Sequence, residues 1–283
     1  MNKLPITIFH YCTGQSFFEI ITFKKLWLNS LFETNDYLER RWLDGILKKK
    51  LEEKQGNTQE YITFSKSVQI LYTLNNEMVV PYFFSFSQHK DLLSQWRGYA
   101  DDGQGFALGF NPQFFEISYN VPFTSANPED AIGIFDVIYD QKGLNQRVDE
   151  TISFYWKHFE ADNYVQNSPA MIECVVNLVR LATRAKNPSF SEEHEWRICY
   201  TPIIRYGRGK HEILGKLTPM KFRIKNGNHL TSYFEFPFNA PALTAIVIGP
   251  KNNTFPETIR DFLFINGFDI TKIEIAKSNA SYR

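Results

Sequence analysis

Hydrophobic and polar residues alternate in short stretches near both ends of the chain, and they follow a helical spacing in two long stretches between them. Alternation is typical of β-strands, whereas apolar residues three to four positions apart are typical of helices. The pattern predicts strands at 6–11, 26–29, 79–87, 106–110, 132–139, 195–200, 220–224, 232–236, 243–248 and 273–276. It predicts helices at 15–25, 36–54, 59–74, 91–99, 144–159, 169–186 and 254–266.

The order of these elements is not the regular strand–helix–strand alternation of a doubly wound fold. We therefore predict an α+β protein with a mixed or antiparallel sheet and with helices inserted at about 33–76 and 143–187. No Gly/Ser linker, internal repeat or low-complexity tract marks a boundary. A single domain spanning 1–283 is the resulting expectation.

Composition agrees with a large packed core, because 43% of the residues are hydrophobic and 16% are aromatic. Such a chain is not expected to be disordered. Its 31 basic and 31 acidic side chains give a formal net charge of zero. Non-specific binding to nucleic-acid backbones is therefore disfavoured, although a local basic patch at 205–210 leaves that option open.

The three cysteines, Cys12, Cys174 and Cys199, are far apart and form no C-x-x-C pair. A structural zinc site and a disulfide framework are both disfavoured, which favours a reducing compartment. The first residues form no leader peptide, and no run approaches the ~20 apolar residues that span a bilayer. We expect a cytoplasmic protein without membrane contact or metal.

No phosphate-binding loop, dinucleotide fingerprint or metalloprotease motif is present, so the candidate chemistry rests on looser groups of residues. His10 ends the first predicted strand and is followed by Tyr11 and Thr13. The histidine either faces a cleft or is satisfied by backbone groups.

A second group is the aromatic strand with Ser85 and Ser87, which alternation places on one face with Phe83. Tyr82 precedes them in the same strand. Two hydroxyls beside an aromatic ring suit a polar ligand in a groove. The same pattern also fits an edge strand whose polar face meets water.

Trp96, Arg97 and Tyr99 form a third group on a predicted short helix, before a Gly-containing turn at 101–105. Trp96 and Tyr99 are three residues apart and share a helical face. They either anchor a core or stack on a ligand. Arg97 either binds a phosphate or pairs with a neighbouring aspartate.

A fourth group consists of Glu193, Glu195 and Arg197, which alternation places on one face of a strand. A carboxylate crowded by another one in a partly apolar cleft tends to have a raised pKa. The alternative is a Glu195–Arg197 ion pair on the surface, which would contribute little to stability.

These groups together resemble the prokaryotic DUF2971 family, a family of unknown function. The resemblance lies in Asn35-Asp36 with Glu39, Ser85-Phe86-Ser87, Trp96-x-x-Tyr99-Ala100 with Gly105, Glu193-x-Glu195-Trp196-Arg197, and the final Tyr282-Arg283. The piece from Trp96 to Gly105 is fairly specific.

The order of the polar groups also resembles that of ADP-ribosyltransferases. In that superfamily a first strand gives a His or Arg, a second gives S-x-S or Tyr, and a late strand gives the catalytic Glu. His10, Ser85-Phe86-Ser87 and Glu195 occupy those places. Glu193-His194-Glu195 has the E-x-E form of the arginine-modifying branch, but that branch usually begins with Arg, so the target residue stays open.

This second resemblance implies a split β-sheet core and NAD as the substrate. Glu195 would stabilise the oxocarbenium ion formed when the nicotinamide–ribose bond breaks. The further roles it implies are ribose binding by His10, orientation of the acceptor by Glu193, and cofactor binding by Tyr11, Thr13, Tyr82, Phe83, Ser85, Ser87, Trp96, Arg97 and Tyr99. Among these, Tyr82 or Phe83 would stack on nicotinamide.

The leading hypothesis is therefore an NAD-consuming ADP-ribosyltransferase-like enzyme, acting as a toxin or an anti-phage defence effector. Its acceptor would be a protein or a nucleic acid, and an antitoxin or other partner protein would fit such a role. Two alternatives stay open. One is an NAD glycohydrolase, and the other is a non-catalytic sensor module that binds a nucleotide or a partner in the same groove.

Overall fold

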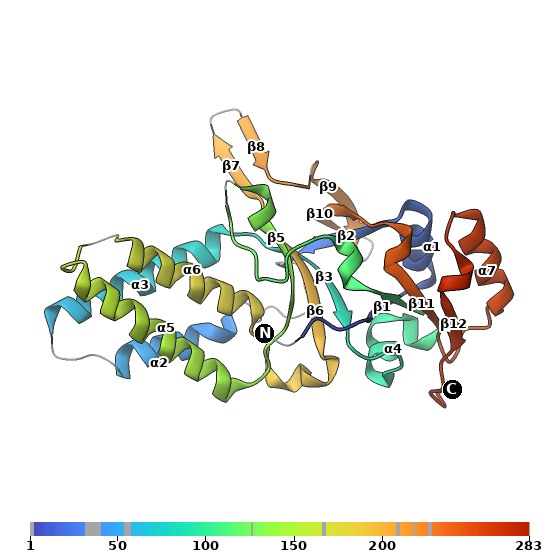
Figure 1. The fold of residues 1–283 in the computed structure, drawn as a ribbon, viewed down its shortest axis with the longest axis horizontal. Coiled ribbons are helices and arrows are strands. Elements are labelled where there is room, and N and C mark those ends of the chain that lie inside the picture. The colour runs from blue at the N-terminus through green and yellow to red at the C-terminus, as the bar shows by residue number, and fades with distance from the viewer. Residues whose placement is uncertain are drawn as a thin grey trace.

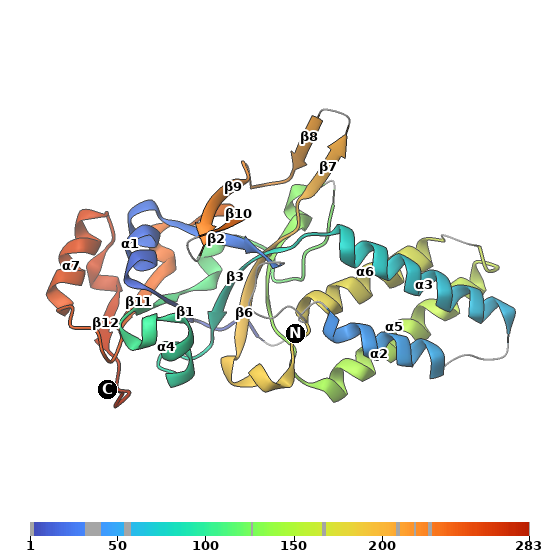
Figure 2. The same cartoon turned by 180° about the vertical axis from the view of Figure 1, so that it is seen from behind.

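The structure is a computed structural model of the chain, and it describes residues 3–31, 41–53, 58–125, 127–165, 168–207, 210–217, 219–225 and 228–282. It has a β-sheet body at one end and a bundle of helices at the other (Figure 1). Small helices cover the sheet at the end away from the bundle, and the view from behind shows the same division (Figure 2).

The strands form one large sheet and one small hairpin. They are β1 (Ile8–Cys12), β2 (Lys25–Ser30), β3 (Tyr82–Ser87), β4 (Phe106–Phe110), β5 (Ile132–Asp136), β6 (Glu195–Tyr200), β7 (Ile203–Gly207), β8 (Lys210–Leu214), β9 (Lys221–Lys225), β10 (His229–Pro237), β11 (Leu243–Ile248) and β12 (Glu274–Lys277). The α-helices are α1 (Gly14–Phe23), α2 (Trp42–Glu53), α3 (Gln59–Met78), α4 (Leu93–Tyr99), α5 (Gln141–Ala161), α6 (Pro169–Arg184) and α7 (Pro256–Ile265).

The large sheet runs in the order β12-β11-β4-β1-β3-β2-β10-β9, and β6 and β5 continue from β3. Among the described residues, the strand pairs of this sheet are antiparallel, except that β11 and β12 are parallel. The remaining pair, β7 and β8, forms an antiparallel hairpin that projects from the body (Figure 1). The predicted α+β class is thus confirmed, with a mostly antiparallel open sheet.

The sheet divides at β3, because two strands share one edge of it. β1 pairs with the end of β3 at Phe9 and Ser87, whereas β2 pairs with its beginning at Asn29 and Phe83. The opposite edge of β3 pairs with β6 along its whole length. Between the two contacts, the middle of β3 has no strand partner on this edge among the described pairings. This split positions the candidate site.

Alternation along the strands explains how the sheet buries its core. Tyr82, Phe84 and Phe86 of β3 pack on one face with Trp196, Ile198 and Tyr200 of β6, as their sequence spacing predicts. Burial of such large rings is the main contribution to the stability of the sheet. The opposite face of β3 and β6 carries Phe83 and Cys199, which belong to a smaller cluster.

Helices α2, α3, α5 and α6 form a hydrophobic core separate from that of the sheet. They lie at the two predicted insertions. The helix α6 begins with Ser168, which accepts a hydrogen bond from the Met171 amide, and with Pro169 at its first position. It ends at Arg184, because Ala185 adopts an extended backbone conformation. A single domain over the whole chain stays a prediction.

Several boundaries differ from the predicted ones. The β7–β8 hairpin was missed, and it covers much of the predicted basic patch at 205–210. Short turns within 101–103, 112–115 and 188–193 are 3₁₀ helices. The predicted helix cap at Asn35 or Asp36, and Glu39 of the family pattern, lie outside the described residues.

Candidate functional site

A cavity of about 700 Å³ opens at the split in the sheet. Its walls come from β1, β2, β3, α4, β6 and the segment before β6. Among its lining residues are the predicted site residues His10, Tyr11, Thr13, Phe83, Ser85, Ser87, Tyr99, Glu193 and Glu195. Segments far apart in the sequence therefore meet at one concave site, as such sites require.

His10 fills part of the gap left by the missing strand pairing. Its Nδ1 lies 2.9 Å from the carbonyl oxygen of Ser85, and its ring lies 4.0 Å from that of Phe84, centroid to centroid. A carbonyl oxygen only accepts, so Nδ1 carries the proton and Nε2 keeps a lone pair. Burial lowers the pKa of His10 to about 4, although the bond to Ser85 opposes this shift. The imidazole is thus neutral at physiological pH.

The two serines of β3 differ in exposure. Ser85 is exposed, whereas Ser87 is buried and its hydroxyl accepts a hydrogen bond from the His89 amide at 3.2 Å. Ser85 therefore offers a hydroxyl to the cavity, and Ser87 mainly shapes the end of the strand.

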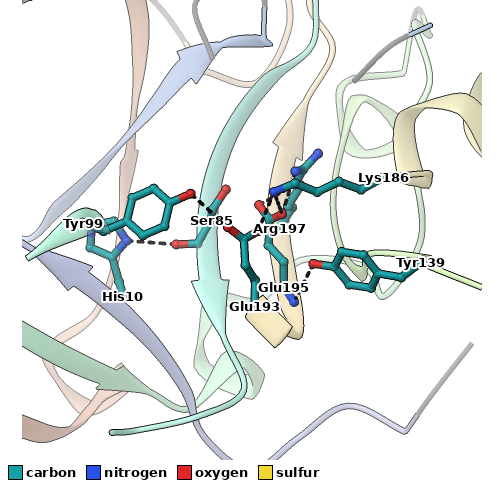
Figure 3. A network of polar contacts seen from close by, with 8 residues as sticks. All are labelled: His10, Ser85, Tyr99, Tyr139, Lys186, Glu193, Glu195 and Arg197. Atoms are coloured by element: carbon teal, nitrogen blue, oxygen red, sulfur yellow. Dashed lines mark hydrogen bonds and ion pairs between the residues drawn. The ribbon is translucent and has the colours of Figure 1, made fainter. Parts of the chain in front are cut away.

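Glu193 and Glu195 lie in a buried cluster with two cations (Figure 3). Arg197 donates to both oxygens of Glu195, from Nε to Oε1 at 2.6 Å and from Nη2 to Oε2 at 2.7 Å. The ammonium of Lys186 lies 2.5 Å from Glu193 and 2.9 Å from Glu195. Two acids and two bases thus neutralise one another, which buried charges require.

The pKa of Glu195 is lowered to about 2. Burial alone would raise it, but the charges of Arg197 and Lys186 and hydrogen bonds from Arg197 and Ser85 outweigh that effect. The predicted rise in the pKa of a crowded carboxylate is therefore wrong for this residue. The crowding expected from Glu193 is offset by the two cations. The alternative of a Glu195–Arg197 surface pair is also wrong, because both side chains are buried.

The two glutamates meet by a different route from the predicted one. Glu193 ends a 3₁₀ helix (Pro188–Glu193), and the strand begins only at Glu195. Between them His194 adopts a φ of 41°, in the left-handed region. The shared strand face predicted for the two glutamates is thus wrong, and the turn together with Lys186 brings the carboxylates to one cluster.

Two tyrosines hold this cluster from either side (Figure 3). The Tyr99 hydroxyl donates to Oε1 of Glu193 at 3.0 Å, and the Tyr139 hydroxyl accepts from the Glu195 amide at 3.2 Å. Burial and the nearby carboxylates raise the pKa of both phenols. Both tyrosines therefore stay protonated over the physiological range and act as hydrogen-bonding groups.

His10 and the acidic cluster lie on opposite sides of β3, with Ser85 between them (Figure 3). The carbonyl of Ser85 binds His10, and its hydroxyl contributes to the low pKa of Glu195. The imidazole and the carboxylates thus line one cavity through a shared strand residue. Glu195 is on neither a remote surface nor a separate face of the molecule.

A further part of the cavity, the cationic arm, lies along β2 and β9. It was not predicted as part of the site. Arg223 donates to Oδ1 of Asn29 at 2.7 Å, and its guanidinium lies 5.2 Å from the Trp27 ring and 5.9 Å from the Tyr233 ring. The partly exposed Trp27 also lines the cavity. A cation with an aromatic surface beside it suits a ligand that has both phosphate and a flat ring.

Three residues that were predicted to contact a ligand lie outside the cavity lining, and a fourth lines the cavity with its polar group already engaged. Trp96 is fully buried and donates from its indole to Asp91 at 2.7 Å, so it anchors a core and does not line the cavity. Tyr82 is buried with its hydroxyl on Ser232, also away from the cavity lining. Arg97 is exposed near Tyr282, outside the lining.

Tyr11 is the fourth case, since its ring lines the cavity but is buried beside Trp96. Its hydroxyl donates to the His89 carbonyl at 2.8 Å and accepts from the Leu92 amide. Thr13 is the helix cap of α1 and accepts from the Ser16 amide. Both residues fix the wall of the cavity with their polar groups already engaged.

Sequence reasoning missed Lys186, Tyr139, Trp27 and Arg223. The alternation of Lys25, Trp27 and Asn29 against Leu26, Leu28 and Ser30 could have indicated a strand with a cavity-facing side, because β2 follows that pattern. Lys186 gave no local signal. Its role depends on the turn that brings the end of α6 to β6.

Among the residues that the structure describes, no group of three or more His, Cys, Asp or Glu side chains could hold a metal ion. Nor does any helix in the described ranges have the length and apolar character needed to cross a membrane. The three cysteines are buried, and none of them forms a disulfide bond.

The fold and the site define a mixed α+β protein with a buried acid–base cluster at a split sheet. The family model described as "Protein of unknown function (DUF2971)" matches residues 95–198. This match confirms the DUF2971 resemblance for that stretch, which contains the Trp96–Gly105 piece and the Glu193–Arg197 piece. No curated protein and no solved structure matches the chain.

Proposed function

We propose that the chain is an NAD-consuming enzyme of the ADP-ribosyltransferase type. The observation that carries this proposal is that His10, Ser85 and Glu195 line a single cavity at the split between β1 and β2. A sheet divided in this way is also what the ADP-ribosyltransferase-like fold would require.

In the proposed reaction, the bond between C1′ of the nicotinamide-side ribose and the nicotinamide nitrogen breaks. Its electron pair leaves with nicotinamide, and C1′ becomes an oxocarbenium ion. A nucleophile of the acceptor then adds to C1′ and releases its proton to water. Glu195 is anionic at any physiological pH because its pKa is lowered to about 2, so it would stabilise the positive charge without taking up a proton.

The other residues would bind and orient the substrate. Nε2 of His10 would accept a hydrogen bond from a ribose hydroxyl, and the exposed hydroxyl of Ser85 would bind the same sugar. Glu193 would orient the acceptor beside Tyr99. At the other arm, Arg223 would bind the diphosphate and Trp27 would offer a ring for stacking.

Nicotinamide release from NAD by the purified chain tests this proposal. Glu195→Gln should lower the rate by about 10²–10³-fold, as for the loss of one electrostatic contact with the transition state. Glu235→Gln is the matched control, because this glutamate is ion-paired with Lys25 and Lys221 away from the acidic cluster. Unchanged release in a folded Glu195→Gln sample would refute the role of Glu195.

Removing a buried charge from this cluster is also expected to cost roughly 3–5 kcal/mol of stability. Circular dichroism and thermal unfolding must therefore accompany the assay. His10→Gln provides a second variant that removes no charge, and it should also lower nicotinamide release. Labelled NAD separates the two enzymatic possibilities, because label on a protein or nucleic acid indicates transfer, whereas free ADP-ribose alone indicates a glycohydrolase.

One observation favours a second candidate, a non-catalytic sensor that binds a nucleotide. Both oxygens of Glu195 are engaged by Arg197 and Lys186, as in a purely structural ion cluster. This candidate predicts NAD or ADP-ribose binding without turnover. Calorimetric binding together with no nicotinamide release would favour it over the enzyme.

For the proposed enzyme, a role as a toxin or in anti-phage defence would follow from NAD depletion or target modification in a prokaryotic cytoplasm.

A further inference from the structure

A second cavity lies between α5, α6 and the segment that precedes β5, and it shares no lining residue with the candidate site. Its volume is about 540 Å³, within the range of small-molecule sites. Its walls carry three arginines together with amide, hydroxyl and apolar groups. The arginines are Arg147, Arg180 and Arg184, and Glu150 and Phe154 line the same cavity.

Arg180 is a half-buried cation in the wall of this second cavity, and none of the described acidic side chains forms an ion pair with it. Its guanidinium lies 4.4 Å from the Phe123 ring, and its buried Nε has no acceptor among the described residues. Burial lowers its pKa, and the more distant charge of Asp130 opposes that shift only in part. A buried guanidinium nitrogen without a hydrogen-bond acceptor is costly, so an anion within reach of Nε would be stabilising.

The other charged groups leave the cavity with an excess of cationic groups. Arg184 is engaged by Asp136 of β5. It donates a hydrogen bond to the Asp136 carbonyl oxygen at 2.7 Å and forms an ion pair with the Asp136 carboxylate. Arg147 is exposed on α5, and no ion pair of its side chain occurs within the described part of the chain. Glu150 is the one acid in the lining and accepts from Gln146. Arg147 and Arg180 thus face one carboxylate.

Neutral groups beside these arginines suit the rest of a ligand. Nδ2 of Asn177 donates to the Tyr155 hydroxyl at 2.8 Å, which fixes both side chains at the wall. Phe154 is 54% exposed and offers its ring at the mouth of the cavity. Guanidinium groups bind phosphate through two parallel hydrogen bonds, and an exposed ring next to them offers a stacking surface.

We propose that this second cavity binds a phosphate-bearing small molecule of nucleotide size. Arg147 and Arg180 hold its phosphate, and its apolar or aromatic part lies against Phe154 and Leu181. The site does not depend on the reaction proposed for the first cavity.

Isothermal titration of the full chain with pyrophosphate and with ATP tests this assignment. Replacing Arg147 and Arg180 together by Gln should weaken binding of both probes by at least about tenfold. Replacing Lys142 and Lys157 by Gln is the matched control, since both are exposed on α5 and neither lines the cavity. ATP should bind more tightly than pyrophosphate, because only ATP carries a ring for Phe154.

Three results would overturn the proposal. One is the absence of binding by the unmodified chain at millimolar probe. Another is binding that survives the double arginine variant but is lost in Arg223→Gln, which would place the anion in the first cavity. The third is equal affinity for the two probes, which would show that the ring of ATP makes no favourable contact with Phe154. A chain that does not cleave NAD can still be tested for binding of pyrophosphate and ATP. The proposal for the second cavity and the proposal for the first cavity can therefore fail independently.

Discussion

At the scale of single residues, the site is governed by the neutralisation of buried charge. Glu195 is forced to stay ionised by Arg197 and Lys186, whereas His10 is forced to stay neutral by burial. Desolvation disfavours a charged group unless a partner is supplied, and only the glutamate has such partners. A fixed anion and a fixed neutral hydrogen-bond acceptor suit the stabilisation of a cation more than proton transfer.

The protonation of His10 gives a direct check. Its pKa is about 4 in the folded chain and near 6.5 in an unfolded one, so its ring signals should not titrate between pH 7 and 5 in an NMR experiment. In urea the same signals should titrate near 6.5.

The same shift affects stability. Between pH 6.5 and 4 the unfolded chain binds a proton that the folded chain does not, so the free energy of unfolding should fall as the pH falls through this range. His10→Gln should make this dependence less steep. A folded-state titration of His10 near pH 6.5 would contradict the burial described for it.

The sequence predicted many of the residues that line the site. It did not predict how these residues are arranged in space. The alternation correctly placed Phe84 and Phe86 in the core and left Ser85 outside it, because strand periodicity is a local property. It did not predict that the two phenylalanines also line the cavity. The pKa of Glu195 was misjudged because Lys186 is nine positions away along the chain and reaches the cluster only through a turn. Trp96 was ambiguous between core and ligand, since both functions favour a large ring at that position.

At the scale of elements, the segment from Trp96 to Gly105, which lies in the stretch that the family model matches, connects a core to the site. Trp96 anchors α4 in a core, and Tyr99 reaches Glu193 in the site. The amide of Gly105 donates to the Ala100 carbonyl at 2.8 Å and closes the turn before β4. A Cβ at Gly105 would lie 2.0 Å from the carbonyl oxygen of Cys12, so only glycine fits.

Gly105→Ala should therefore be destabilising by roughly 1–3 kcal/mol or more, because the backbone of β1 must move. Gly98→Ala is a matched control within the same segment, since a Cβ there meets nothing within 4 Å and alanine favours the helix by up to about 1 kcal/mol. Urea unfolding monitored by circular dichroism compares the two variants. Equal midpoints would contradict the close approach of Gly105 to β1.

The end of α6 is the second element whose position matters. Arg184 binds Asp136 of β5, and two residues later Lys186 binds both glutamates. Residues 138 and 185 also pair in a parallel bridge. The helical bundle is thus joined to the sheet through buried ion pairs, and those of Lys186 lie at the site itself. Helix periodicity predicted α6 well, but not this docking, which depends on contacts between distant segments.

At the scale of the whole molecule, a helical bundle with its own core adjoins a sheet that is divided at β3. The α+β class could be predicted, because long helical and alternating stretches are separate in the sequence. The division of the sheet could not be derived from periodicity, since it depends on which strands pair. It brings the cationic arm with Arg223 and the acidic cluster with Glu195 to one cavity.

A crystal structure of the Glu195→Gln chain with NAD tests this arrangement most directly. We predict the nicotinamide-side ribose within hydrogen-bond distance of Nε2 of His10, facing position 195, and the diphosphate near Arg223. An empty cavity at millimolar NAD, or NAD bound away from the split in the sheet, would contradict the assignment of this cavity as the NAD site.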